Sequence, residues 1–283
     1  MKKPLVIGHR GTAHLGPQNT KAAFLIAKDC KADGIETDLQ LTLDNKIVIN
    51  HNWFIDDNSN GSGAVCSLTY DELSKYDYGA YKDEKFKGEK ILTLEELLEI
   101  VKDFKVINLE LKSRLKKEYP FAKTAADTVD KMGLTDKVIF SSFDVDLMRQ
   151  IKQYNPKFKV GILTMPDHIN KRFREMGAYF LSAYPVADPD AALADINKDI
   201  PWTRFIDELD FKPDCFHPDY HSVLNDEHLV EEMHKRGLAV NPYTCDDPED
   251  MKKLIAAGCD GIISNRPDIL YKVVNGEIYF YKT

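Results

Sequence analysis

Short apolar runs alternate with longer helical segments along almost the entire chain, and this rhythm constrains the fold more than any other feature. Eight of the runs read as β-strands. They are Leu5–Gly8, Gly34–Leu41, Val106–Leu111, Val138–Ser142, Val160–Leu163, Cys215–His217, Leu238–Asn241 and Gly261–Ser264. Strands that alternate with helices form a parallel sheet. Eight strand–helix units in 283 residues predict a (β/α)8 TIM barrel. The open doubly wound sheet is disfavoured because the sequence has no G-x-G-x-x-G or Walker-type loop.

The segments between these runs carry helix-start signals. Thr93 precedes the apolar stripe of residues 94–101 and is followed by two glutamates in the first turn. Asp247 and Pro248 open another segment, with Asp at the cap and Pro in the first turn. Both segments are therefore predicted to be helices.

Two stretches interrupt the rhythm. Trp53 to Gly88 is polar and rich in turn residues, which predicts a loop or small insertion after the second strand. Asp188 to Pro213 is predicted to be a second long connection with helical parts, and Glu277–Tyr281 a terminal strand outside the barrel. The chain has no evident repeat or Pro-rich linker. We expect one barrel domain over residues 1–283, with the insertion at about 53–88.

Charge and hydropathy exclude several classes of function. The chain has 46 acidic and 38 basic residues, giving a formal charge of −8. Nucleic-acid backbones select basic surfaces, so a nucleic-acid partner is disfavoured. No run approaches the ~18 apolar residues that cross a bilayer. The apolar stretch Leu5–Ile7 is too short for a signal peptide. Five scattered cysteines without C-x-x-C spacing indicate free thiols. These features predict a cytoplasmic protein with no membrane segment, with a trimmed secreted form as the alternative.

Carboxylates occur at regular places in the predicted strands. Glu36 and Asp38 are two positions apart, so their side chains lie on one strand face with Cα atoms about 6.5 Å apart. Glu110 and Lys112 repeat this spacing on the third strand, and Leu109 and Leu111 face the opposite side. Taken singly, Glu36 or Asp38 is equally well explained as a strand residue that faces solvent.

Two histidines and an arginine lie at equivalent strand ends. His9 and Arg10 follow the first strand, and His51 ends a short extended stretch at residues 46–50. In a barrel, side chains at the carboxyl ends of the strands converge on one mouth. All seven polar residues would then share one site, although His51 alone reads more readily as a structural or surface histidine.

The seven residues together suit the binding and cleavage of a phosphate ester. Glu36, Asp38 and Glu110 form an all-oxygen ligand set suited to one divalent cation, Mg²⁺ or Ca²⁺, with Mn²⁺ also compatible. Without a cation, three buried carboxylates would repel one another. Arg10 and Lys112 are suited to bind a phosphate. His9 and His51 are suited to act as general acid and general base.

These residues occur in motifs that resemble those of the glycerophosphodiester phosphodiesterase family. The N-terminal motifs are His9-Arg10-Gly11, Pro17-Gln18-Asn19-Thr20, Ala23-Phe24, Gly34-Ile35-Glu36-Thr37-Asp38 and His51-Asn52. The later ones are Thr93-Leu94-Glu95-Glu96, Asn108-Leu109-Glu110-Leu111-Lys112, Ser141-Ser142-Phe143, Asp247-Pro248-Glu249-Asp250-Met251 and the segment Gly258–Pro267. The resemblance covers nearly the whole chain in order and is weakest between about residues 164 and 235.

The resemblance implies a TIM barrel with a small insertion after the second strand. It implies that the three carboxylates bind a divalent cation, that His9 and His51 are the acid–base pair, and that Arg10 and Lys112 contact phosphate. The implied reaction cleaves a small-molecule glycerophosphodiester to an alcohol and glycerol 3-phosphate, with water or a neighbouring substrate hydroxyl as nucleophile. The sequence carries no signal for the oligomeric state.

Three departures from the family pattern stand near this site. Gln18 replaces a Glu, Asn52 replaces the Asp that follows the second histidine, and Tyr243 stands where the family usually has Trp. Gln and Asn can still form hydrogen bonds but supply no negative charge. Tyr243 offers an aromatic wall with a hydroxyl, for a choline-like or glycerol group or for packing.

Two further residues are candidate substrate contacts. Phe143 lines the pocket or packs in the core, and His217, at the end of a predicted strand, has a site role or a structural role with equal weight. Two other functions remain open: a related phospholipase or sphingomyelinase-D-like lyase that acts on intact lipid, and a non-catalytic barrel that binds a phosphodiester.

Overall fold

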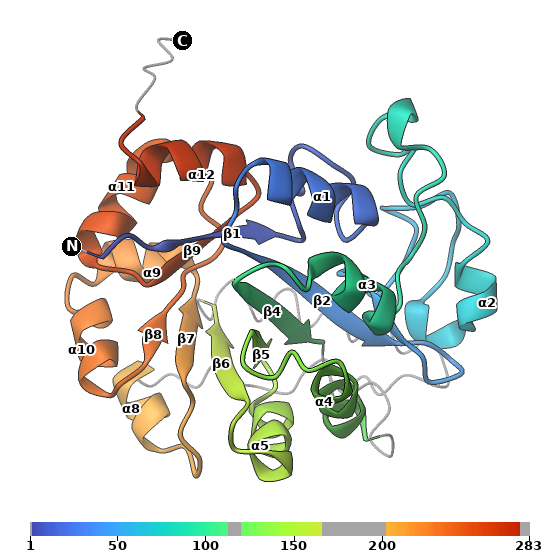
Figure 1. The fold of residues 1–283 in the computed structure, drawn as a ribbon. Helices are drawn as coiled ribbons and strands as arrows, with labels where there is room; N and C mark the ends of the chain where they lie inside the picture. Colours follow the sequence, from blue (N-terminus) through green and yellow to red (C-terminus); the bar gives the residue numbers. More distant parts are fainter. Residues whose placement is uncertain (1, 113–119, 166–201, 278–283) are drawn as a thin grey trace.

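The computed structural model describes residues 2–112, 120–165 and 202–277. Its centre is a nearly closed barrel of eight parallel strands surrounded by helices, which confirms the predicted fold (Figure 1). The strands are β1 (Leu5–His9), β2 (Gly34–Leu41), β4 (Val106–Leu111), β5 (Val138–Ser142), β6 (Lys159–Thr164), β7 (Cys215–Pro218), β8 (Ala239–Val240) and β9 (Gly261–Ser264). Each end lies within one residue of the prediction.

The neighbour order of the strands is β8-β7-β6-β5-β4-β2-β1-β9. Backbone hydrogen bonds then join the two end strands. The N–H of Asp260 donates to the carbonyl of Val240 at 2.9 Å, and the N–H of Ile263 donates to that of Pro242 at 3.0 Å. The ring is thus closed between β8 and β9. The short extended stretch before His51 is β3 (Ile47–Ile49), which pairs antiparallel with β2.

The helices cover the outside of the barrel. They are α1 (Lys21–Asp29), α2 (Tyr70–Leu73), α3 (Leu94–Val101), α4 (Phe121–Lys131), α5 (Val145–Tyr154), α8 (Trp202–Asp207), α9 (Tyr220–Asn225), α10 (Leu229–Lys235), α11 (Pro248–Ala257) and α12 (Pro267–Val274). Thr93 and Glu96 form a reciprocal capping box at the start of α3. Asp247 caps α11, with Pro248 in the first turn. Both helix predictions are confirmed.

Alternation along the strands separates two environments. Ile35 and Leu39 on β2 and Leu109 on β4 are fully buried against the surrounding helices. Successive strand residues point to opposite faces, so Glu36 and Glu110, which lie between these apolar positions, face the barrel interior. The outer shell of the barrel is therefore apolar, and the interior near β2 and β4 is polar.

Aspartates fasten the amino-terminal end of the barrel. Three of them stand just before a strand, and each accepts a hydrogen bond from a backbone N–H of the neighbouring strand. The pairs are Val6 N–Asp33 Oδ2 at 3.0 Å, Val160 N–Asp214 Oδ2 at 2.9 Å and Val240 N–Asp260 Oδ2 at 3.0 Å. In this fold the amino-terminal face stabilises the barrel, while chemistry occurs at the other end.

The segment between β3 and α3 lies beside the barrel, beyond β2 (Figure 1). It contains α2 and two short 3-10 turns, η1 (Val65–Ser67) and η2 (Glu84–Phe86). A separate apolar cluster holds it together, formed by Val48, Ile55, Val65, Leu73, Tyr78 and Ile91. The polar stretch of the sequence thus folds around a small core of its own.

Parts of two predictions lie outside the described residues. The connection Asp188–Pro213 is described only from position 202, where it contains α8. The predicted terminal strand Glu277–Tyr281 is described only at Glu277. Among the helices of the described ranges, none is long and apolar enough to cross a membrane.

Candidate active site

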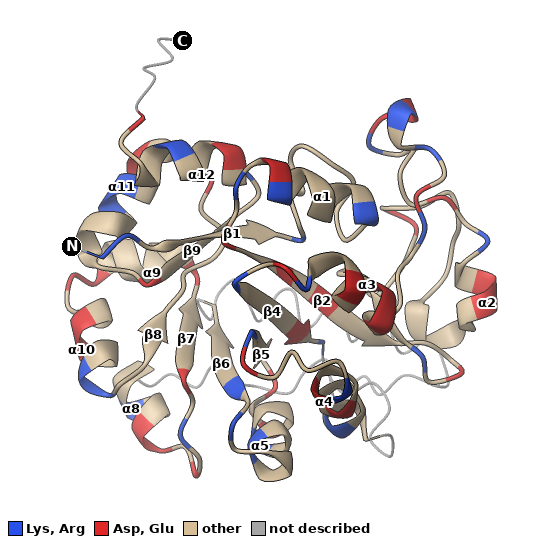
Figure 2. Cartoon of the chain, in the orientation of Figure 1, with Lys and Arg blue, Asp and Glu red and all other residues tan. Residues whose placement is uncertain are grey.

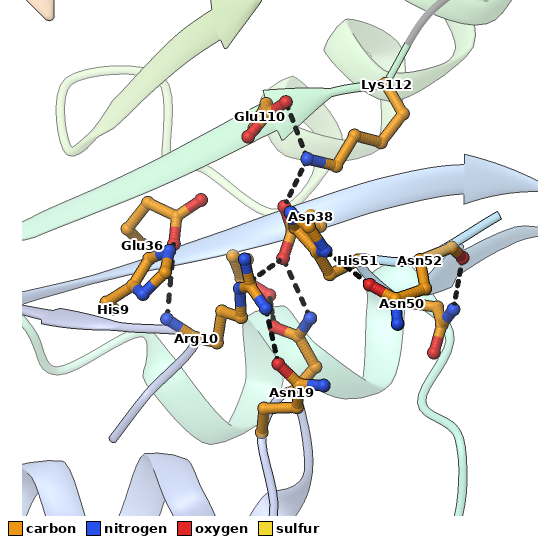
Figure 3. Close-up of polar contacts among 12 residues, drawn as sticks. His9, Arg10, Asn19, Glu36, Asp38, Asn50, His51, Asn52, Glu110 and Lys112 are labelled. Atoms are coloured by element: carbon orange, nitrogen blue, oxygen red, sulfur yellow. Dashed lines mark hydrogen bonds and ion pairs between the residues drawn. The ribbon is translucent and has the colours of Figure 1, made fainter. Parts of the chain in front are cut away.

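Charged residues of both signs are interspersed over the outer helices, whereas the barrel strands carry few charges (Figure 2). The carboxyl-terminal halves of β1, β2 and β4 are the exception. Register places His9 beside Glu36, and Asp38 beside Glu110. Arg10, Lys112 and His51 follow β1, β4 and β3, and they lie around the same carboxylates (Figure 3). The structure therefore brings together the seven polar residues that the sequence analysis placed in one site.

Three carboxylates form the centre of this cluster. Glu36, Asp38 and Glu110 are 5%, 0% and 8% exposed, and each offers an oxygen within 4.8 Å of the other two. Burial, together with the negative charges of Asp38 and Glu110, raises the pKa of Glu36 well above its usual range. Such a set of hard oxygen ligands fits a divalent cation, which would offset the repulsion.

Two cationic side chains lie against the carboxylates. Lys112 Nζ is 2.9 Å from Asp38 Oδ1 and 2.7 Å from Glu110 Oε1. Arg10 Nε is 3.7 Å from Asp38 Oδ2. Burial alone would raise the pKa of Asp38, but the positive charges of Lys112 and Arg10 outweigh it and hold the pKa well below its usual range.

A left-handed turn aims Arg10 into the site. Its φ is 51°, and Gly11 follows with φ of 79°. A Cβ at Gly11 would lie 2.8 Å from the backbone carbon of Ala23 in α1, so only glycine fits there. Arg10 Nη1 donates to Gln18 Oε1 at 2.5 Å. Gln18, which stands where the family has a glutamate, thus accepts a hydrogen bond from Arg10 without carrying a charge.

Asn19 is a site residue that the sequence analysis did not single out. Its Nδ2 donates to Asp38 Oδ2 at 2.8 Å, and its Oδ1 accepts from Thr37 Oγ1 at 2.8 Å. Its φ is 61°, a conformation that asparagine tolerates better than most residues. The sequence feature that could have pointed to Asn19 was its position directly before Thr20, the N-cap of α1.

His9 is held by an amide from the last βα loop. Its Nδ1 lies 2.7 Å from Asn265 Oδ1, and Asn265 Nδ2 donates to Asp246 Oδ2 at 2.7 Å. The carboxylate only accepts, so Asn265 turns its oxygen to His9 and the imidazole carries its proton on Nδ1. Nε2 is left facing Glu36 Oε2 at 3.7 Å. Burial, and then the charge of Arg10, lowers the pKa of His9 to about 3.

His51 sits on a tightly held loop. Gln40 Nε2 donates to the backbone carbonyls of Asn50, His51 and Asn52 at 2.7, 3.1 and 2.7 Å. His51 Nδ1 lies 2.7 Å from Asn52 Oδ1. Burial, and then the charges of Lys112 and Arg10, lowers the pKa of His51 well below its usual range. Gln40 and Asn52 therefore fix the loop and the ring of this histidine.

The three remaining candidates belong to other strands of the barrel: Phe143 follows β5, His217 lies in β7 and Tyr243 follows β8. Phe143 and Tyr243 form an edge-to-face pair with ring centroids 6.2 Å apart, and Tyr243 Oη donates to the carbonyl of Thr164 at 2.9 Å. Burial, and then the negative charge of Glu110, raises the pKa of Tyr243 well above its usual range. His217 is buried and bonds to Asn241, with 3.1 Å between Asn241 Nδ2 and His217 Nε2. Among the described residues, none of the seven side chains of the polar cluster forms a hydrogen bond with His217.

Two buried polar residues next to the carboxylates were also missed. Asn108 lies beside Glu36 in the register of β4 and β2, and Ser141 lies beside Glu110 in that of β5 and β4. Within the described ranges, the polar side-chain atoms of Asn108 and Ser141, and Nδ1 of His217, have no hydrogen-bond partner. Unpartnered buried polar groups are costly. This side of the interior is thus suited to water or to a ligand that carries hydroxyl groups.

The arrangement combines three carboxylates that could hold a hard cation, two cationic side chains and two imidazoles around one mouth. Such a set can bind a phosphate ester, stabilise added negative charge on phosphorus and move protons.

Comparisons with known proteins agree with this chemistry. The model of the "Glycerophosphoryl diester phosphodiesterase family" matches residues 9–269. A glycerophosphodiester phosphodiesterase from Caldanaerobacter subterraneus subsp. tengcongensis is 34% identical over 279 residues, covering 96% of this chain and 98% of the relative.

Solved structures of low identity share the fold. A putative glycerophosphoryl diester phosphodiesterase from Silicibacter pomeroyi has a TM-score of 0.77 at 20% identity, covering 97% of this chain and 94% of the other. A phosphodiesterase from Oleispira antarctica, solved with the product sn-glycerol-3-phosphate, has a TM-score of 0.74 at 22% identity, covering 96% and 97%.

Proposed function

This chain belongs to the glycerophosphoryl diester phosphodiesterase family, and from that premise we propose that it hydrolyses glycerophosphodiesters to an alcohol and glycerol 3-phosphate with the help of a divalent cation. The observation that carries the proposal is the convergence of three buried carboxylate oxygens within 4.8 Å of one another, flanked by two histidines and two cationic side chains.

Glu36, Asp38 and Glu110 would hold the cation. The donor set is all oxygen, which fits Mg²⁺ or Ca²⁺ and also accommodates Mn²⁺. A cation bound there supplies positive charge to a phosphoryl oxygen and polarises the ester.

Arg10 and Lys112 bind the phosphate in this proposal. Arg10 Nε is buried and forms no hydrogen bond within the described part of the chain, so it is available to a phosphate oxygen. Lys112 lies between Asp38 and Glu110, where a cation would take over part of its present role and leave its ammonium for the substrate.

His9 and His51 act as the acid–base pair. Both are neutral and carry their free lone pair on Nε2, because Nδ1 of each is bonded to an asparagine oxygen. One imidazole takes the proton from the nucleophile, which is water or a neighbouring hydroxyl of the substrate. In the second case the alcohol leaves behind a cyclic phosphate, which water then opens to glycerol 3-phosphate. The other imidazole donates a proton to the departing alkoxide. The charge of a bound phosphodiester favours the protonated form of this second imidazole.

The glycerol part faces the interior beside β4, β5 and β7, next to the carboxylates. The Phe143–Tyr243 pair offers an aromatic wall, and Asn108, Ser141 and His217 offer buried polar atoms without partners among the described residues. A three-carbon group with hydroxyls matches this mixture of apolar and polar surface.

We also propose that residues 1–283 form one barrel domain with its insertion, and that the protein is cytoplasmic, in keeping with its five free thiols.

The test measures glycerol 3-phosphate release from glycerophosphocholine and glycerophosphoethanolamine by metal-stripped protein, before and after adding Mg²⁺, Ca²⁺ or Mn²⁺. We expect release only with metal, and none from Glu36→Ala. Glu99→Ala is the matched control, because Glu99 is an exposed glutamate of α3 far from the mouth. Absence of release with all three metals would reject the proposal.

A further inference from the structure

Asn52 links His51 to an aspartate that the sequence motif does not include. Asn52 Oδ1 lies 2.7 Å from His51 Nδ1, and Asn52 Nδ2 donates to Asp57 Oδ2 at 3.0 Å (Figure 3 shows the first contact). The carboxamide is thus held at both ends, by an imidazole and by a carboxylate.

The donor and acceptor roles in this chain follow from chemistry. A carboxylate can only accept, so the amide nitrogen of Asn52 must face Asp57 and its oxygen must face His51. An amide oxygen can only accept as well, so His51 Nδ1 carries the proton. The lone pair of the neutral ring then lies on Nε2, where it is available for proton transfer.

An asparagine after the histidine can turn the wrong group toward Nδ1, which an aspartate cannot do. A carboxylate presents an acceptor to Nδ1 in either orientation, but a carboxamide can rotate and present its NH₂ group. The imidazole proton would then move to Nε2, and Nε2 would lose the lone pair that it needs for proton transfer. The backbone of Asn52 cannot relieve this, because Gln40 and Asn50 each donate to its carbonyl at 2.7 Å. Only the side-chain torsion remains free.

We propose that Asp57 is a positioning residue for the reaction: it prevents rotation of the Asn52 amide and thereby keeps the proton of His51 on Nδ1. This rests on the proposed role of His51. The flipped amide would set its oxygen against the Asp57 carboxylate, acceptor against acceptor. Asp246 and Asn265 hold His9 by the same geometry, which shows that an amide backed by a carboxylate can serve this purpose in the chain.

The test compares Asp57→Ala with Asp56→Ala. Asp56 is the adjacent loop aspartate, and its carboxylate accepts hydrogen bonds from Ser62 and Gly63. Two readouts are used: kcat and KM on glycerophosphocholine with Mn²⁺, and ¹⁵N NMR of histidine-labelled protein, with His51 assigned by its absence in His51→Gln. For Asp57→Ala we expect kcat to fall at least tenfold with KM within twofold, and the Nε2–H tautomer of His51 to appear. For Asp56→Ala we expect neither change.

Rescue separates positioning from a structural role of the loop. Asn52→Asp places a carboxylate directly on His51 Nδ1, so adding Asp57→Ala to it should cost less than twofold in kcat. The proposal is overturned if Asp57→Ala keeps His51 protonated on Nδ1, or if the double variant loses as much activity as Asp57→Ala alone. If the wild-type protein releases no glycerol 3-phosphate with any metal, the proposed function fails, and the NMR signals still decide whether Asp57 sets the tautomer.

Discussion

The ammonium group of Lys112 lies 2.9 Å from Oδ1 of Asp38, across the neighbouring strands β2 and β4. It also lies 2.7 Å from Glu110, so one lysine balances two of the three carboxylates. Glu36 has no such partner among the described residues: it accepts the backbone N–H of Arg10 at 3.2 Å and faces His9 at 3.7 Å. Glu36 is therefore the carboxylate whose charge is least compensated when no cation is bound.

Replacing Glu36 by Gln should stabilise the metal-free protein and weaken cation binding. It removes one of three mutually repelling charges and keeps an oxygen for the N–H of Arg10. We expect a gain of about 1 kcal/mol, or a rise in Tm of ~2 °C, in the presence of a chelator. The Tm increase that Mn²⁺ gives the wild-type protein should be absent in the variant. Thermal unfolding with chelator and with Mn²⁺ checks both; a lower Tm for metal-free Glu36→Gln would contradict the argument.

Asp260→Ala should lower stability without changing the chemistry. Asp260 accepts the N–H of Val240 and bonds to His234 at 2.8 Å, at the amino-terminal end of the barrel where β8 meets β9. Losing these bonds should cost about 1–3 kcal/mol and lower Tm by ~2–6 °C. Below the new Tm, kcat should be unchanged, because the mouth is at the other end. A large fall in kcat at 25 °C would show that the two ends are coupled.

Gly161→Ala should disturb His217. A Cβ at Gly161 would lie 2.9 Å from Cε1 and Nε2 of the His217 ring, so the ring must move and its bond to Asn241 must weaken. We expect a loss of about 1–3 kcal/mol in the free energy of unfolding. His217→Ala in the same background should relieve the clash, so the two losses should not add. Simple additivity in denaturant unfolding would show that the ring is not the obstacle.

Tyr243 is expected to act through its ring. Tyr243→Phe keeps the edge-to-face contact with Phe143 and loses only the bond to the Thr164 carbonyl. Its KM for glycerophosphocholine should stay within twofold, with stability lower by about 1 kcal/mol. Tyr243→Ala should raise KM about tenfold, equivalent to ~1.4 kcal/mol of binding. A KM raised equally in both variants would assign the contribution to the hydroxyl instead.

The segment beside the barrel should respond to acid through Asp77. The backbone N–H of Ala80, and also those of Gly79 and Gly88, donate to this carboxylate and lower its pKa. A depressed pKa contributes stability above the unfolded value, near 3.8, and that stability is lost as pH falls through the folded pKa. The Tm difference between wild type and Asp77→Ala should therefore be constant from pH 5 to 8 and shrink below about pH 4. A difference that does not shrink at all as pH falls below 4 would contradict this assignment.

The strands and the inward face of the site followed from the sequence because both depend on short-range order. A strand repeats every two residues, so Glu36 and Asp38 between Ile35 and Leu39 define which face is polar without any knowledge of the partner strand. Helix caps such as Thr93 are equally local. Eight strands separated by helices then leave few topologies, which made the convergence of His9, Glu36 and Glu110 predictable.

Hydrogen-bond partners were decided only by the closed barrel. His9 and Asn265 are 256 positions apart, and they meet because β9 closes beside β1. The pairing of Lys112 with Asp38 and, among the described residues, the unpartnered amide of Asn108 likewise depend on which strand lies alongside. The orientation of the Asn52 carboxamide depends on the folded shape of its own loop. A sequence pattern records which side of a strand is polar, but the choice among nearby donors and acceptors is made by distances of about 3 Å that exist only after the chain has folded.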